Sequence, residues 1–207
     1  MRCLVPVDLE APKSRLAAVL SPTERQAFAR AMLEDVVSTL TAADCQPTVV
    51  ATARIDDETL PDRTTVAVDD RPLTAAINAR LADGEPTLVV MADLPLVKPT
   101  DVRRLTESDA GVTIAPGLGG GTNALVVREP AFRVDYHGLS FLDHCRAATQ
   151  IQANVETIDS RRLATDIDEP ADLAEVLIHS TRGAASWLSS AGFDLETTDG
   201  RVSVVRE

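Results

Sequence analysis

Short apolar runs alternate along the chain with longer segments of helical periodicity, and this alternation predicts an α/β fold with a mainly parallel sheet. The most informative run covers residues 87–91, where a threonine is followed by four apolar residues. Such a run is typical of a strand that is buried on both faces in the middle of a parallel sheet. Pro95 follows and cannot donate a hydrogen bond to a strand ladder, so the strand ends before it. We therefore expect residues 87–91 to form the central strand.

The longest helix is predicted from a start signal at Ser21, which combines a capping serine with Pro22 in the first turn and Glu24 three residues on. Apolar residues then recur at every fourth position from Phe28 as far as Leu40. Similar reasoning predicts helices at residues 73–81, 100–105, 141–149, 168–178 and 184–188. Further strands are expected at residues 2–7, 48–52, 65–68, 112–115, 124–127 and 155–158.

The end of the chain has the pattern of a β-hairpin. Alternating runs at residues 193–197 and 202–205 flank the pair Asp199-Gly200, which favours a tight turn. The sequence contains neither internal repeats nor a low-complexity linker. Residues 1–207 are therefore predicted to form a single domain, and the C-terminal helix and hairpin (about 183–207) are a candidate interface element of a homodimer.

The composition narrows the classes of partner. The chain has 207 residues and a formal net charge of −12, with a pI near 4.7, so its surface repels nucleic acid and anionic membranes. Lys13 and Lys98 are its only lysines and aromatic residues make up 3%. Such an acidic, lysine-poor surface suits concentrated salt, which predicts a halophilic source.

The location is predicted from what the sequence lacks. No apolar run approaches the roughly 18 residues that cross a bilayer. The first residues turn acidic too soon for a signal peptide. The three cysteines are widely spaced, which favours neither a disulfide framework nor a zinc site. A cytoplasmic location is expected.

Asp93 follows the predicted central strand. Open α/β sheets bind their ligands at the carboxyl ends of their strands, which makes Asp93 a candidate site residue. The alternative is a turn residue that caps the next segment.

A second cluster, Lys13-Ser14-Arg15, lies just past the first predicted strand. Lysine as a point charge and arginine as a planar fork suit a polyphosphate. The alternative is a solvated loop, because the chain has no glycine-rich phosphate cradle of the Walker or dinucleotide type.

A third cluster contains Asp166 and Asp168, which lie on the same side of an extended segment because side chains alternate there. Together with Asp93 they could hold one or two Mg²⁺ ions, which prefer carboxylate and phosphate oxygens. The alternative for Asp168 is a helix cap before Glu169 and Pro170.

The fourth cluster consists of three glycines at residues 119–121 followed by Thr122 and Asn123. Glycines let the backbone approach a ligand closely, and consecutive amides can form a nest for an anion. A flexible turn is the alternative. Downstream, Ser140 begins a predicted helix, where it could cap the helix or meet a phosphate. The three histidines, His137, His144 and His179, are interpreted as structural or surface residues.

Taken together, these motifs resemble the 2-phospho-L-lactate guanylyltransferase family of coenzyme F420 biosynthesis, and its archaeal members in particular. The stretches that carry the resemblance are residues 12–16, 91–95, 119–125, 140–142 and 165–173. The resemblance implies a nucleotide-diphospho-sugar transferase-like fold, a three-layer α/β/α sandwich with a mainly parallel mixed sheet. It also implies that 2-phospho-L-lactate and GTP react to give lactyl-2-diphospho-5′-guanosine and pyrophosphate.

The resemblance further implies roles for individual residues. Asp93, Asp166 and Asp168 would hold Mg²⁺, and Lys13, Arg15 and Asp93 would be the catalytic residues. Lys13 and Arg15 would meet the GTP phosphates, and the acceptor phosphate would lie against Thr122, Gly138 and Ser140. The guanine pocket would draw on Pro6 in the first strand and on Asp70, Leu73 and Asn78.

Other functions remain open at this point. The same fold could serve another acceptor, such as phosphoenolpyruvate or 3-phosphoglycerate, or another nucleotide. A nucleotide-binding module without catalysis is a further alternative. The preferred phospho-acid, the oligomeric state and the number of metal ions are not determined by the sequence.

Overall fold

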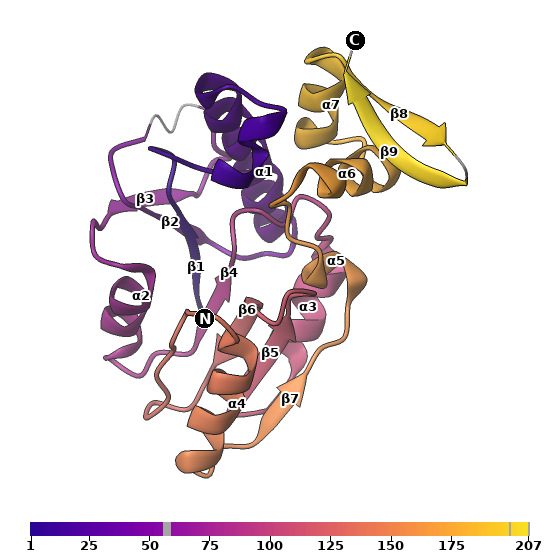
Figure 1. Cartoon of the computed structure of the whole chain (residues 1–207). Coiled ribbons are helices and arrows are strands. Elements are labelled where there is room, and N and C mark those ends of the chain that lie inside the picture. Colours follow the sequence, from indigo (N-terminus) through magenta and orange to yellow (C-terminus); the bar gives the residue numbers. More distant parts are fainter. Residues whose placement is uncertain (56–58, 199, 207) are drawn as a thin grey trace.

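The architecture follows from a seven-stranded sheet with the strand order β3-β2-β1-β4-β6-β5-β7 (Figure 1). The structure is a computed structural model that describes residues 1–55, 59–198 and 200–206. In sheet order, the strands are β3 (Thr65–Val68), β2 (Pro47–Ala51), β1 (Arg2–Val7), β4 (Thr87–Val90), β6 (Thr122–Val127), β5 (Val112–Pro116) and β7 (Val155–Thr157).

The sheet is mixed, and within its described strands only β6 runs against its neighbours. β1, β2, β3 and β4 pair in parallel, as do β5 and β7, whereas β6 pairs antiparallel to both β4 and β5. The reversal arises because the short segment at residues 117–121 joins β5 directly to β6, and so short a connection makes an antiparallel pair. β4 lies fourth of the seven strands, which confirms the predicted central strand, although it ends at Val90, one residue earlier than expected.

Helices cover both faces of this sheet and give three layers. One face packs against α1 (Pro22–Ala42), α3 (Pro99–Glu107) and α5 (Arg161–Ala164). The other face packs against α2 (Leu73–Leu81) and α4 (Ser140–Gln150). Side chains alternate along the strands, so that Leu88 and Val90 face the first layer and Val89 faces the second. The central strand β4 is apolar after Thr87 because both of its faces are buried, whereas the edge strands β3 and β7 are largely exposed.

The C-terminal segment forms a third apolar cluster. It contains the 3-10 turn η2 (Pro170–Asp172), the helices α6 (Leu173–His179) and α7 (Gly183–Ser190), and a separate two-stranded sheet of β8 (Phe193–Thr198) and β9 (Arg201–Arg206). Phe28 of α1 packs against Trp187 of α7, with ring centroids 5.3 Å apart. Figure 1 shows the hairpin beside α6 and α7 and away from the main sheet.

The strand order determines where a ligand can lie. From β1 the chain proceeds to β2 and β3 on one side, whereas β4 and the later strands lie on the other side. The segments that follow β1 and β4 thus leave the carboxyl ends of two neighbouring parallel strands, at the point where the order of the strands reverses. Crevices at such a switch point are the usual ligand sites of open α/β sheets.

The main elements confirm the sequence prediction, with some differences in detail. Residues 168–178 do not form one helix, because Asp168 precedes a 3-10 turn and α6 begins only at Leu173. The 3-10 helix η1 (Ser14–Ala18) and α5 were not predicted, since both are too short to show periodicity. Asp199 of the predicted hairpin turn lies outside the described residues. In the described ranges no helix is both long and apolar enough to span a bilayer.

Candidate active site

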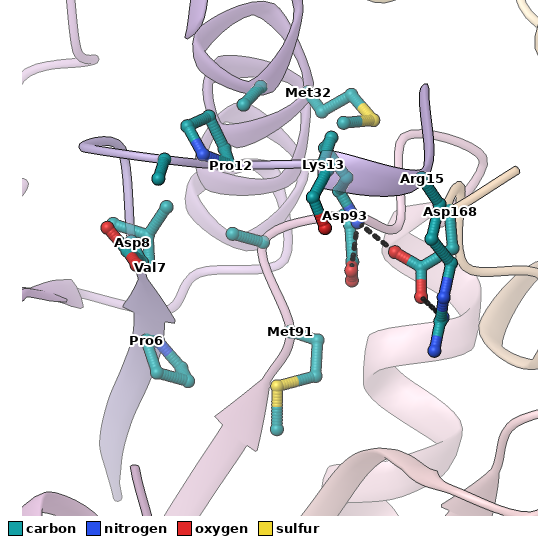
Figure 2. Close-up of a pocket in the computed structure, with 14 residues that line it drawn as sticks. Pro6, Val7, Asp8, Pro12, Lys13, Arg15, Met32, Met91, Asp93 and Asp168 are labelled. Atoms are coloured by element: carbon teal, nitrogen blue, oxygen red, sulfur yellow. Dashed lines mark hydrogen bonds and ion pairs between the residues drawn. The ribbon is translucent and has the colours of Figure 1, made fainter. Parts of the chain in front are cut away.

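Three segments far apart in the sequence bring charged side chains together at the carboxyl ends of β1 and β4 (Figure 2). Nζ of Lys13 lies 2.6 Å from Oδ2 of Asp93 and 2.6 Å from Oδ1 of Asp168. Lys13 follows β1, Asp93 follows β4 and Asp168 precedes η2. Three residues that the sequence identified separately therefore meet at one point of the crevice.

The surroundings of Lys13 explain how its charge is held. Its side chain is 10% exposed, and burial alone lowers the pKa of this amine, but the charges of Asp93 and Asp168 outweigh that effect and raise the pKa above its ordinary value. Lys13 also adopts a left-handed backbone conformation with φ 53° and ψ 47°. That conformation costs a residue other than glycine roughly 1 kcal/mol or more.

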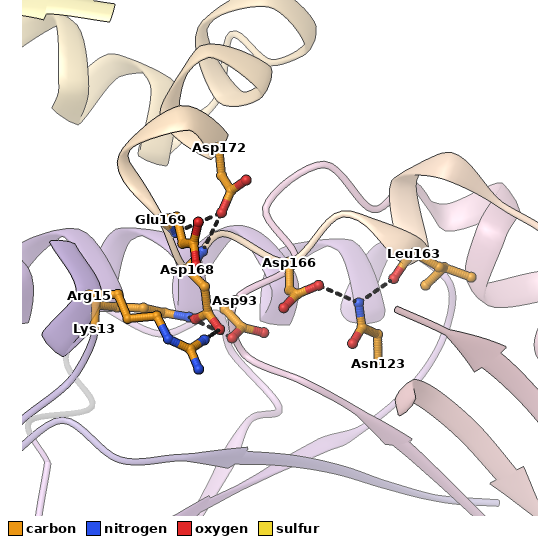
Figure 3. Close-up of polar contacts among 9 residues, drawn as sticks. All are labelled: Lys13, Arg15, Asp93, Asn123, Leu163, Asp166, Asp168, Glu169 and Asp172. Atoms are coloured by element: carbon orange, nitrogen blue, oxygen red, sulfur yellow. Dashed lines mark hydrogen bonds and ion pairs between the residues drawn. The ribbon is translucent and has the colours of Figure 1, made fainter. Parts of the chain in front are cut away.

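The backbone around Asp168 is fixed by hydrogen bonds on both sides (Figure 3). The amide of Ile167 donates to the Asp93 carbonyl at 3.1 Å, which ties the segment to the end of β4. The amides of Asp168 and Glu169 donate to Oδ2 of Asp172 at 2.9 and 2.7 Å. Asp172 thus caps the turn, and the carboxylate of Asp168 is left to face Lys13.

Arg15 adds a second cation beside the same carboxylate. Its Nη1 lies 3.0 Å from Oδ2 of Asp168, and its side chain is 67% exposed. Lys13 is enclosed while Arg15 lies open to solvent, so Arg15 can reach a bound anion with little rearrangement.

Asp166 lies beside the cluster, next to Asn123 (Figure 3). Its Oδ1 accepts a hydrogen bond of 3.0 Å from Nδ2 of Asn123, which also donates to the carbonyl of Leu163. Burial raises the pKa of Asp166, and the charges of Asp93 and Asp168 add to this rise, while the hydrogen bond from Asn123 opposes it. Asn123 lies so close to Gly117 that a Cβ at residue 117 would be 2.6 Å from its Oδ1. The glycine is needed for this contact.

The expected magnesium site is not preformed. Within the described ranges, no group of three or more histidine, cysteine or acidic side chains is arranged to hold a metal ion. The ammonium group of Lys13 lies between Asp93 and Asp168, where it supplies the positive charge. The donor chemistry still suits Mg²⁺, because Asp93, Asp166 and Asp168 offer hard oxygen ligands, and Asp93 and Asp168 lie close enough to Asp166 to raise its pKa.

Two adjoining cavities open at this edge of the sheet. The larger, of about 390 Å³, is lined by Lys13, Arg15, Asp93 and Asp168 and by residues of β1 and α1. The smaller, of about 170 Å³, has mainly apolar walls that include Leu73. Pro6, Val7, Asp8 and Met91 line both cavities, so the two lie side by side. A charged compartment beside an apolar one matches the phosphates and the base of a nucleotide.

Of the four residues expected around the base, two line the smaller cavity and two do not. Pro6 and Leu73 line the smaller cavity. Asp70 is exposed and does not line it. Asn78 is turned away from it, because its side-chain amide both donates to and accepts from the backbone of Val134, at 2.9 Å each. The expectation that Asp70 and Asn78 form the base pocket is therefore not met by their positions.

Asp69 lines the smaller cavity, although the sequence analysis missed it. Its carboxylate is held by Arg71 and Arg80, and hydrogen bonds from these guanidinium groups hold its pKa well below the usual range. Asp69 is the first residue after β3. Asp93 was selected because a carboxylate at the end of a strand is a candidate site residue, and the same rule could have identified Asp69.

The glycine segment is a closed turn. The amide of Gly120 donates to the Gly117 carbonyl at 3.0 Å, and the amide of Gly117 donates to the Gly121 carbonyl at 2.9 Å. The amide of Gly120 is therefore used within the turn, so a nest of consecutive amides at residues 119–121 cannot include it in this conformation. Gly120 has φ +83°, and a Cβ there would lie 2.8 Å from Leu139. Glycine is required at this position.

The residues expected to meet an acceptor phosphate lie near one another but outside the lining of both cavities. Thr122 begins β6 and is 3% exposed, while Gly138 and Ser140 lie at the start of α4. The carbonyl of Gly120 accepts a 3.2 Å hydrogen bond from the amide of Phe141. The turn that precedes Thr122 is thereby joined to the start of α4.

The whole chain, residues 1–207, matches the model of a protein family described as guanylyl transferase CofC like. The 2-phospho-L-lactate guanylyltransferase of Halorubrum lacusprofundi is 56% identical over 220 residues, which cover 100% of both chains. The protein of that name from Natrialba magadii is 52% identical and covers 100% of this chain and 99% of its own length. The one from Methanoregula boonei is 45% identical and covers 98% of this chain and 94% of its own length.

Solved structures confirm the fold. A candidate nucleotide-diphospho-sugar transferase from Desulfovibrio desulfuricans superposes with a TM-score of 0.76 at 14% identity, over 92% of this chain and 95% of that one. The 2-C-methyl-D-erythritol 4-phosphate cytidylyltransferase of Thermus thermophilus gives a TM-score of 0.55 at 14% identity, over 87% and 99% of the two chains. At such low identity these similarities concern the fold alone.

Proposed function

Because the chain belongs to the guanylyl transferase CofC-like family, we propose that it transfers GMP from GTP to 2-phospho-L-lactate. The products are lactyl-2-diphospho-5′-guanosine and pyrophosphate, in coenzyme F420 biosynthesis. The observation that carries the proposal is the convergence of Lys13, Asp93 and Asp168 at the switch point between β1 and β4. Full-length relatives named for this activity support the choice of substrates.

The reaction needs little covalent chemistry from the protein. An oxygen of the acceptor phosphate attacks the α-phosphorus of GTP, and the bond from that phosphorus to the bridging oxygen of the β-phosphate breaks to release pyrophosphate. The attacking oxygen is already ionised, so the site needs no general base. Catalysis then depends on positioning and on the neutralisation of charge. Lys13 and Arg15 are the cations that this chain offers to the triphosphate.

Magnesium would complete the charge balance. We propose that Asp93, Asp166 and Asp168 hold the ion, which would neutralise the phosphates of the two anionic substrates when bound. Because Lys13 lies between Asp93 and Asp168, its ammonium group would compete with such an ion for these carboxylates and, once displaced, would be available to a phosphate.

The two substrates are assigned to different parts of the site. The smaller cavity, with Pro6 and Leu73 in its wall, would take the guanine, and Asp69 at its rim would replace Asp70 in our assignment. The acceptor phosphate would lie between Thr122 on β6 and the start of α4 at Gly138 and Ser140. This arrangement leaves the larger cavity for the triphosphate.

Product analysis tests the proposal directly. The protein is incubated with Mg²⁺, GTP and one acceptor at a time, namely 2-phospho-L-lactate, phosphoenolpyruvate or 3-phosphoglycerate, and the guanylylated product is identified by mass. ATP and CTP serve as matched nucleotide controls. Release of pyrophosphate with GTP and 2-phospho-L-lactate supports the proposal. Tight GTP binding without release, or release with CTP alone, contradicts it.

We also propose that the enzyme is a homodimer and that it works in the cytoplasm. The hairpin β8–β9 packs against α6 and α7 but leaves Leu195 and Val202 exposed, and these apolar side chains offer a contact to a second copy of the chain. The three cysteines of the chain are free thiols, as is usual in a reducing compartment. Light scattering of the whole chain and of a chain ending at Gly192 tests the dimer. If light scattering gives the same oligomeric state for both proteins, the hairpin has no role in assembly.

A further inference from the structure

His144 is a buried residue of α4 whose two ring nitrogens are both engaged. Its Nδ1 lies 2.9 Å from Oγ1 of Thr122, and its Nε2 lies 2.9 Å from the backbone nitrogen of Asp135. The side chain is 0% exposed. The rings of Phe132 and Tyr136 pack edge-on against the imidazole, with centroids 5.9 and 5.1 Å away. The ring therefore has a single orientation.

These contacts determine which nitrogen carries the hydrogen. A backbone N–H can only donate, so Nε2 must accept from Asp135 with a free lone pair. The neutral ring then carries its hydrogen on Nδ1, which donates it to the hydroxyl of Thr122. Burial lowers the pKa of His144 to about 4, which agrees with a neutral ring.

The direction of this hydrogen bond decides what Thr122 can do. Its hydroxyl oxygen accepts from His144, so its own hydrogen remains free to donate. In the part of the chain that the structure describes, His144 is the hydrogen-bond partner of this hydroxyl. Phosphate oxygens at neutral pH mainly accept hydrogen bonds, so a hydroxyl with a free hydrogen is complementary to them.

His144 also connects the separate parts of the acceptor site. It lies four residues after Ser140 on α4, so the two share one face of the helix. Through Asp135 it holds the segment that leads to Gly138. Through Thr122 it holds the first residue of β6. One imidazole thus determines how Thr122 lies relative to the start of α4.

We propose that His144 is a positioning residue that turns the hydroxyl of Thr122 into an aimed hydrogen-bond donor for the phosphate of the acceptor. The inference rests on the role of Thr122 proposed above. His144 does not itself touch the substrate; it acts through Thr122.

Two substitutions separate this role from simple packing. In an asparagine side chain the amide group lies as far from the backbone as Nδ1 of histidine, so it can still donate a hydrogen bond to Thr122. In a glutamine side chain the amide group reaches as far as Nε2, so it can keep only the contact with the backbone amide of Asp135. We expect His144→Gln to raise the KM for 2-phospho-L-lactate about tenfold, the size of one lost hydrogen bond to a charged group. The KM for GTP should not change. In His144→Asn the KM for the acceptor should stay close to the wild-type value.

Thr122→Val provides the matched control, because it removes the hydroxyl and keeps the shape. It should raise the KM for the acceptor by about tenfold or more. The double variant with His144→Gln should be no worse than Thr122→Val alone, since both changes remove the same interaction. Additive effects, or a normal acceptor KM in His144→Gln, would overturn the inference.

The outcomes distinguish the two proposals. If Thr122→Val leaves the acceptor KM unchanged while GTP and 2-phospho-L-lactate still react, the role of Thr122 fails, and the role of His144 fails with it, but the proposed reaction stands. A readout without activity is the ¹⁵N spectrum of the wild-type imidazole. It should show a neutral ring with hydrogen on Nδ1, and hydrogen on Nε2 would overturn the inference even if the variants do not fold.

Discussion

Nζ of Lys13 lies 2.6 Å from Oδ2 of Asp93, although 80 residues separate them in the sequence. The contact joins the segment after β1 to the segment after β4 across the switch point of the sheet. It also places Lys13 beside both Asp93 and Asp168, with Arg15 as a second cation on Asp168. The site therefore contains an internal cluster of ion pairs.

Asp93→Asn should lose most of the guanylyltransferase activity, by about 10²-fold or more, because an amide is a much weaker ligand for Mg²⁺ than a carboxylate. The measurement is the rate of pyrophosphate release at saturating GTP and acceptor. Asp109→Asn is the matched control, because Asp109 is exposed and lies outside the lining of both cavities. Near-normal turnover in Asp93→Asn would remove Asp93 from the metal site.

Lys13→Met should bind Mg²⁺ more tightly than the wild type in the absence of substrates, because the ammonium group no longer competes for Asp93 and Asp168. The same variant should release pyrophosphate at least about tenfold more slowly, because one charge-assisted contact to the triphosphate is lost. Isothermal titration calorimetry with MgCl₂ measures the first effect. Lys98→Met is the control, since Lys98 is exposed. Weaker Mg²⁺ binding in Lys13→Met would contradict competition between the two cations.

His144 predicts how stability depends on pH. Burial lowers its pKa in the folded protein to about 4, despite the nearby carboxylates of Asp135 and Asp143. In the unfolded chain the pKa is about 6.5. Between these values the unfolded state binds the additional proton, so stability is fully present above pH 6.5 and falls as the pH drops towards 4. The loss attributable to His144 is roughly 3 kcal/mol at the low end.

Chemical denaturation at several pH values, compared between the wild type and His144→Phe, isolates this contribution. Phenylalanine keeps the ring and does not titrate, so the stability of the variant should fall less between pH 6.5 and 4. If the free energy of unfolding falls equally with pH in the two proteins, His144 does not have the lowered pKa.

Salt should stabilise the protein. With a net charge of −12, the folded chain repels itself, and the repulsion is screened as the Debye length falls from about 10 Å at 0.1 M to about 3 Å at 1 M salt. We expect the midpoint of thermal unfolding to rise steadily between 0.1 and 3 M KCl. Circular dichroism in the far ultraviolet follows the transition. Greatest stability at low ionic strength would argue against a halophilic adaptation.

Several features could be predicted because their cause is local. The capping serine and glutamate of α1 are both present in the structure, since a cap depends only on residues three apart. Asp93 was identified by its place after an apolar run, and the helix over Leu73–Leu81 was predicted with the bounds that it has. The short helices η1 and α5 carry no such signal. Their formation depends on contacts with the rest of the fold.

The sequence by itself determined the strands, the helices and the side chains that gather at strand ends, because hydrophobic periodicity and turn chemistry act over a few residues. Only the tertiary structure decided which of these side chains face one another. Asn123 faces Asp166, Thr122 faces His144, and Asp69 rather than Asp70 lines the smaller cavity. Such pairs depend on the register between strands and on the closing of long loops. A shift of one residue along a strand turns a side chain to the opposite face, and no local pattern in the sequence records that choice.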